Sequence, residues 1–99
     1  MKFAVVFEDN EAAAHMRAQY MADHLAFLET HAAAISAAGP MTEAETDAPA
    51  GGLWLVEAAT PGEVRALVEA DPFWPTGLRK SVRILAWKQV FADGKRQTI

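Results

Sequence analysis

The sequence predicts one α+β domain over residues 1–99, in which an antiparallel sheet carries two helices on one face. Segments with strand-like alternation and segments that favour helix follow one another in the order β-α-β-β-α-β. Two βαβ halves of this length close into a single ferredoxin-like sheet. The 52% hydrophobic content is enough to build a core, and 99 residues suit one domain.

The first strand is predicted within Met1–Glu8, where Phe3, Val5 and Phe7 alternate with the intervening residues. This apolar run is too short for a signal peptide or a membrane span, so we interpret it as a strand at the N-terminus of the protein. Asp9 or Asn10 then provides a helix cap.

A long helix is predicted from Glu11 to about Ala38, because this stretch is rich in alanine and free of glycine and proline. Its length leaves room for a break near Tyr20. The predicted buried stripe consists of Leu25, Leu28, Ala32 and Ile35. Gly39-Pro40 is expected to end the helix, since proline cannot continue it.

We next predict a short edge strand at Met41–Thr46 and a loop at Asp47–Gly52. A strand at Leu53–Ala59 follows. Thr60 and Glu63 predict a capping box, in which each side chain accepts a hydrogen bond from the other residue's amide.

The second helix buries Val64, Leu67 and Val68 and ends at Asp71, because the residue before Pro72 is pushed out of the helical region. We predict a compact turn or short helix at Pro72–Leu78 and a last strand at Ser81–Phe91. The chain ends in a polar, basic tail after Asp93-Gly94.

The predicted strands carry apolar residues on both faces, and two helices cover only one of them. In the last strand, Val82, Ile84, Ala86 and Val90 share one face, and Leu85, Trp87 and Phe91 share the other. A bare apolar sheet face is unusual in a soluble monomer. We therefore expect a homodimer in which the same sheet of a second copy covers the open face.

Composition excludes several classes of function. The net charge of -4 argues against nucleic acid, and the absence of cysteine excludes thiolate chemistry and fits a reducing, cytoplasmic location. Gly51-Gly52 lacks the lysine and the helix start of a phosphate-binding loop, and no spacing resembles a metal site. Neither a cofactor nor a membrane partner is expected.

Three segments in series resemble the YciI-like (YCII-related) family. They are His24-Leu25-Ala26-Phe27-Leu28 with the later Ala38-Gly39-Pro40-Met41, the strand from Gly52 to Ala59, and Ala70-Asp71-Pro72-Phe73 with Gly77-Leu78 and Val82–Trp87. The resemblance covers nearly the whole chain. It implies a dimeric α+β barrel, related in fold to muconolactone isomerase, in which a histidine and an aspartate face each other in a pocket. Those roles fall on His24 and Asp71.

The resemblance also implies links to the breakdown of aromatic compounds, including a dehydrochlorinase-type reaction. Two positions depart from the family pattern. Met21 stands where relatives often have an arginine, which weakens any inference about an anionic substrate, and Arg17 is the nearest candidate to replace it. Ala86-Trp87 replaces a proline followed by an aromatic residue.

A His–Asp pair suits proton transfer, because imidazole takes and gives protons near neutral pH and a carboxylate fixes its tautomer. Each residue also has a structural interpretation. His24 lies on an apolar helix stripe, where most histidines are structural, and Asp71 before Pro72 is a good cap for the following turn. Because the carboxylate has two oxygens, capping is compatible with pairing to His24.

Tyr20, Arg17 and Phe73 are candidate substrate-binding residues, although solvent exposure or core packing explains them equally well. His15 and His31 are interpreted as surface or groove residues, and Trp54 and Trp87 as sheet-face packing that extends to the dimer contact.

Two main functional hypotheses follow. The first is a proton-transfer enzyme of isomerase, lyase or dehydrochlorinase type acting on a small organic molecule, with His24 as general acid/base and Asp71 as its orienting partner. The alternative is a non-catalytic module of the same fold that binds a small ligand or a partner protein. A third interpretation, a stress or monooxygenase-type α+β barrel protein, needs a substrate cavity between helices and sheet.

Overall fold

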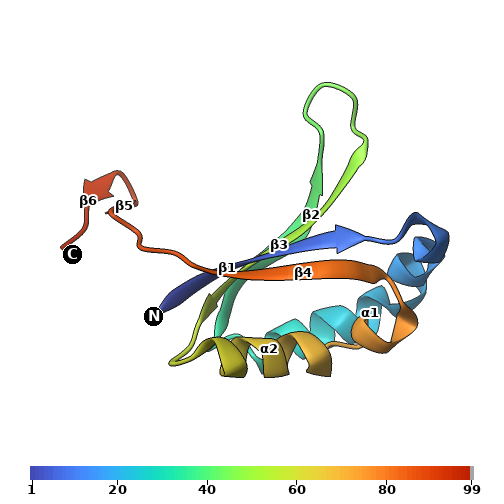
Figure 1. Ribbon diagram of the computed structural model, residues 1–99, viewed down its shortest axis with the longest axis horizontal. Coiled ribbons are helices and arrows are strands. Elements are labelled where there is room, and N and C mark those ends of the chain that lie inside the picture. Colours follow the sequence, from blue (N-terminus) through green and yellow to red (C-terminus); the bar gives the residue numbers. More distant parts are fainter. Residues whose placement is uncertain (99) are drawn as a thin grey trace.

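The computed structural model describes residues 1–98 as a four-stranded antiparallel sheet with two helices on one face (Figure 1). Ile99, the last residue of the predicted domain, lies outside the described residues. The main elements are β1 (Lys2–Asp9), α1 (His15–Thr30), β2 (Ile35–Thr42), β3 (Pro49–Glu57), α2 (Pro61–Ala70) and β4 (Arg79–Ala86). The order β-α-β-β-α-β and the α+β class are therefore confirmed.

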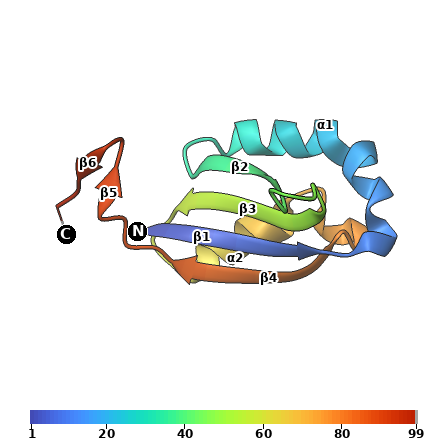
Figure 2. The ribbon, with the colours of Figure 1, turned by 90° about the horizontal axis from the view of Figure 1, so that it is seen from above.

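The strands lie in the order β2-β3-β1-β4, so β1 and β3 are central (Figure 2). On β1, Val5 lies opposite Trp54 of β3 and Ile84 of β4. The core fills the space between the sheet and the helices, and its largest fully buried side chains include Trp54, Phe3 and Phe7. The predicted alternation along β1 and β3 places these side chains on the face that the helices cover.

The long helix predicted for Glu11–Ala38 is wrong at both ends. A 3-10 helix, η1 (Glu11–Ala13), precedes α1 and is capped by Asn10, whose side chain accepts a hydrogen bond from the amide of Ala12. From Ile35 the chain forms β2, which pairs with β3. Alanine is the strongest helix former, but helix propensity is a weak preference, and pairing with β3 overrides it.

Gly39-Pro40 lies inside β2 instead of ending a helix. Proline is tolerated in β2 because it is an edge strand, where N–H groups that face away from β3 take part in no ladder hydrogen bond. Of the predicted helix stripe only Leu28 packs against the core, since Leu25 is 48% exposed, Ala32 lies beyond α1 and Ile35 belongs to β2. The buried face of α1 carries His24, and Phe27 packs against the core beside Leu28.

The strand predicted at Met41–Thr46 and the loop predicted at Asp47–Gly52 are both displaced, because β2 ends at Thr42 and β3 begins at Pro49. Gly51 adopts a φ of +87°, and a side chain there would meet the carbonyl oxygen of Phe7. Glycine at this position therefore allows β3 to approach β1 closely.

The second helix begins and ends where predicted. The Glu63 amide donates to Thr60 Oγ1 over 3.2 Å, but the Glu63 carboxylate accepts from the amide of Ala59 and not from that of Thr60. Asp71 follows α2 in an extended conformation, as expected before proline. A second 3-10 helix, η2 (Trp74–Thr76), occupies the predicted turn.

The last strand is shorter than predicted. It ends at Ala86, and the tail forms a separate small hairpin of β5 (Phe91–Ala92) and β6 (Lys95–Arg96), joined through Asp93-Gly94. The segment predicted only as a basic, polar tail thus includes a short strand, β6. Asp93 and Gly94 both have positive φ, which suits a tight hairpin turn.

The sheet face away from the helices is open (Figure 1). Leu85 on this face is 39% exposed, and Leu53 and Leu55 are partly exposed. Trp54 packs on the sheet as predicted, but on the helix side and only 1% exposed, so it is excluded from any contact through the open face. None of the helices within residues 1–98 is long and apolar enough to cross a bilayer.

Candidate functional site

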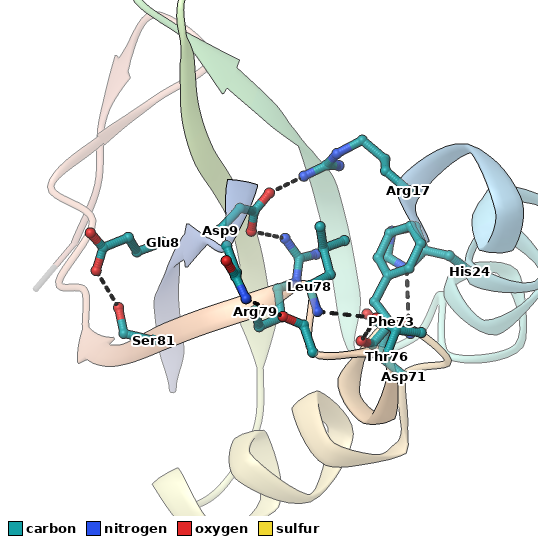
Figure 3. A network of polar contacts seen from close by, with 12 residues as sticks. Glu8, Asp9, Arg17, His24, Asp71, Phe73, Thr76, Leu78, Arg79 and Ser81 are labelled. Atoms are coloured by element: carbon teal, nitrogen blue, oxygen red, sulfur yellow. Dashed lines mark hydrogen bonds and ion pairs between the residues drawn. The ribbon is translucent and has the colours of Figure 1, made fainter. Parts of the chain in front are cut away.

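His24 and Asp71 form a hydrogen bond inside the molecule (Figure 3). His24 projects from α1, Asp71 lies at the end of α2, and 2.8 Å separate Nδ1 from Oδ1. His24 is 7% exposed and Asp71 2% exposed. A carboxylate this deeply buried requires such partners, because an isolated buried charge is costly.

The backbone after α2 fixes the orientation of the Asp71 carboxylate. Its Oδ1 also accepts a hydrogen bond from the Phe73 amide over 3.2 Å, so Asp71 caps the turn as predicted. Both hydrogen bonds fall on the same oxygen, whereas the sequence suggested one for each oxygen. Since Oδ1 is the acceptor in both, His24 Nδ1 is the donor, and the neutral imidazole carries its lone pair on Nε2.

Aromatic rings hold the imidazole in place. The His24 ring stacks on Phe73 with 4.2 Å between ring centroids, and the Trp54 ring lies 6.3 Å away. Within residues 1–98, Nε2 has no hydrogen-bond partner, and it is not among the side-chain atoms that the protein encloses. The ring is therefore fixed through one nitrogen and available for chemistry through the other.

A small hollow of about 80 Å³ opens beside His24, between α1 and the sheet. Its walls come from α1, β2, β3 and β4, and Asp71 lies behind His24, outside the lining. The apolar lining residues include Met21, Leu25, Leu28 and Trp54. The hollow meets a wider surface groove along Arg17 and Pro40, which line both.

Two arginines share one carboxylate at the other end of the hollow (Figure 3). Asp9 Oδ1 accepts from Arg79 Nη1 over 2.9 Å, and Asp9 Oδ2 accepts from Arg17 Nη2. The Arg79 side chain is only 4% exposed, and its guanidinium lies over the rings of Phe7 and Phe73. Burial lowers the pKa of Arg79, although the hydrogen bond to Asp9 opposes this effect.

The predicted substrate-binding residues have different positions. Arg17 lines the hollow, with its guanidinium 5.8 Å from the centroid of the Phe73 ring. Phe73 is fully buried and supports His24 from behind, so its role in the structure is packing. Tyr20 is partly exposed and does not line the hollow. His15 is exposed, and His31 stacks on Phe27.

Arg79 is the site residue that sequence reasoning missed. An arginine at the start of a strand ordinarily predicts a solvated position. Its burial depends on a register shift between Glu8 and Asp9, which brings Asp9 opposite Arg79. A bulge of this kind redirects a side chain, and no local sequence signal reveals it. No group of side chains within residues 1–98 has the arrangement of a metal site.

Comparison with known proteins identifies the class. Residues 1–88 match the YCII-related domain, and the chain belongs to this family, as the resemblance in its sequence predicted. Its structure is similar to that of 5-chloro-2-hydroxyhydroquinone dehydrochlorinase (TftG) from Burkholderia phenoliruptrix AC1100, solved in complex with 2,5-dihydroxybenzoquinone. The TM-score is 0.77 and the sequence identity 33%, with 89% of this chain and 94% of that chain covered. A comparison with curated proteins gave no match.

Proposed function

We propose that this protein is a small enzyme that moves a proton on a small organic molecule derived from an aromatic compound, with His24 as the general acid/base. The observation that carries the proposal is the His24–Asp71 hydrogen bond of 2.8 Å beside an apolar hollow. Similarity to a dehydrochlorinase supports the reaction class, which comprises isomerisation and elimination.

The proposed chemistry follows from the tautomer. His24 Nε2 takes a proton from an acidic carbon or oxygen of the substrate, and Asp71 stabilises the imidazolium that forms. In an isomerisation, the same nitrogen returns the proton to another atom of the substrate. In an elimination, the electron pair left by the proton forms the new double bond, and the leaving group departs with its own bonding pair. Asp71 acts through His24 as a positioning residue.

We also propose that the enzyme is a cytoplasmic homodimer assembled through the open sheet face. Leu85, Leu53 and Leu55 leave apolar surface there, and an equivalent face of a second copy is its simplest cover. In analytical ultracentrifugation, a mass close to that of one 10.7 kDa chain contradicts this assembly.

The experiment that tests the catalytic proposal is replacement of His24 by Gln, with turnover measured on a panel of chlorinated hydroxyhydroquinones. We expect the rate to fall by about 100-fold or more, the usual contribution of a positioned acid/base. His31→Gln is the matched control, because His31 follows the same helix and also packs on an aromatic ring, Phe27.

Turnover of His24→Gln at the wild-type rate rejects the general acid/base role. A small hollow lined by His24 and Arg79 also fits the alternative, a module that binds a small ligand without converting it. That alternative predicts ligand binding by the wild-type protein without turnover of any member of the panel.

A further inference from the structure

Arg79 has more hydrogen-bond donors than the protein satisfies. A guanidinium carries five N–H donors in a fixed plane. Within residues 1–98, Arg79 makes one hydrogen bond, from Nη1 to Asp9 Oδ1. Its Nε is enclosed by protein and has no partner, the one buried side-chain nitrogen or oxygen in that part of the chain without one.

This arrangement leaves positive charge at one end of the hollow. Arginine stays protonated at neutral pH even where burial lowers its pKa. Asp9 is the carboxylate that contacts Arg79, and it also pairs with Arg17, so one negative charge serves two guanidinium groups. The other nearby carboxylate, Asp71, is bonded to His24.

The surrounding residues hold the guanidinium in one orientation. The Arg79 guanidinium carbon lies 4.1 Å from the Phe7 ring centroid and 5.3 Å from that of Phe73. Gly52 makes room for it, because a Cβ at that position would lie 3.3 Å from Nη1. A long side chain fixed between two rings loses little further entropy when a ligand binds, which favours recognition of an anion.

We infer that Arg79 is the anion-binding end of the hollow and that the ligand is a small organic molecule with its negative charge on oxygen. The ionised oxygen bonds to Arg79, and the apolar remainder contacts Met21, Leu28 and Trp54, within the same hollow as His24. The volume of about 80 Å³ is smaller than a cavity of about 150 Å³ that holds benzene, so one end of the ligand extends toward the groove beside Arg17. This inference deepens the proposed function, but the binding step needs no turnover.

The test uses a matched pair of probes, benzoate and benzamide, which have the same ring and differ in the charge of one group. Titrations followed by NMR or calorimetry give both dissociation constants for the full chain. We expect benzoate to bind at least 10-fold more tightly than benzamide. Arg79→Gln is expected to weaken benzoate binding by about 10-fold and leave benzamide unchanged, because charge-assisted hydrogen bonds are lost.

Two further variants keep the test decisive if Arg79→Gln does not fold. Arg79→Lys retains a charge without the planar fork, and Gly52→Ala crowds Nη1, so each is expected to weaken benzoate binding several-fold. The control is Arg65→Gln, since Arg65 is an exposed arginine that also lies over an aromatic ring, Trp74.

The inference is overturned if benzoate binds no better than benzamide, or if every folded Arg79 and Gly52 variant binds benzoate as the wild type does. Its failure is distinguishable from failure of the proposed function. His24→Gln is expected to retain the preference for benzoate whatever happens to turnover, because the charge that selects the anion belongs to Arg79.

Discussion

At each end of the hollow a nitrogen-containing side chain is paired with a carboxylate and contacts the ring of Phe73. The two ends differ in how far their hydrogen-bonding groups are satisfied by the protein. At one end, His24 Nδ1 and the Phe73 amide both donate to Asp71 Oδ1. At the other, Asp9 satisfies one N–H of Arg79 and leaves Nε without a partner.

This difference teaches what each end is suited to do. A histidine fixed through one nitrogen is prepared to exchange a proton through the other. A buried guanidinium that lines the hollow and shares its carboxylate with Arg17 is suited to receive an anion, since its desolvation is only partly compensated. Histidine with its own aspartate thus suits proton transfer, and arginine with a shared aspartate suits ligand recognition.

The largest expected effect is at the His24–Asp71 end of the hollow. Asp71→Asn keeps an oxygen to cap the turn but removes the charge that stabilises a protonated His24. We expect turnover to fall by about 100-fold, whereas the free energy of unfolding falls by only about 1 kcal/mol. Steady-state kinetics and urea denaturation measure the two quantities.

Asp23→Asn is the matched control for that substitution, because Asp23 is exposed on α1. If Asp71→Asn loses stability and turnover in proportion, Asp71 is a structural residue and the division of roles between the two ends is wrong.

A smaller effect is expected at the Arg79–Asp9 end, where a substitution is expected to improve ligand binding. Asp9→Asn removes the carboxylate that competes with a ligand for Arg79, so benzoate affinity is expected to rise about 3-fold. Stability is expected to fall by about 1–2 kcal/mol, because two arginines lose a shared partner. Calorimetric titration measures the benzoate affinity, and urea denaturation measures the free energy of unfolding. Weaker benzoate binding in a folded Asp9→Asn protein contradicts the prediction.

The parts of the fold that the sequence predicted well are those with local signals. Thr60 and Pro72 mark the ends of α2 through capping and backbone restriction, and both boundaries are found where expected. The boundary between α1 and β2 was wrong because the alanine-rich segment after Thr30 has no local signal for strand. Its conformation depends on pairing with β3.

The candidate site shows the same division. His24 and Asp71 were identified through resemblance to a family, and His24 of α1 contacts Asp71 and Phe73 in the segment that follows α2. Arg79 could not be identified, because its burial depends on a bulge at Lys80 in β4, on the absence of a side chain at Gly52 and on rings from distant segments.

The most direct test of the account is NMR of the imidazole nitrogens of His24 in the folded, neutral-pH protein labelled with nitrogen-15 histidine. The account predicts that Nδ1 carries the proton, held by Asp71, and that Nε2 is unprotonated and shifts when a ligand occupies the hollow. A His24 ring protonated at Nε2 with a bare Nδ1, or an Nε2 signal that no hollow-binding ligand moves, would contradict it.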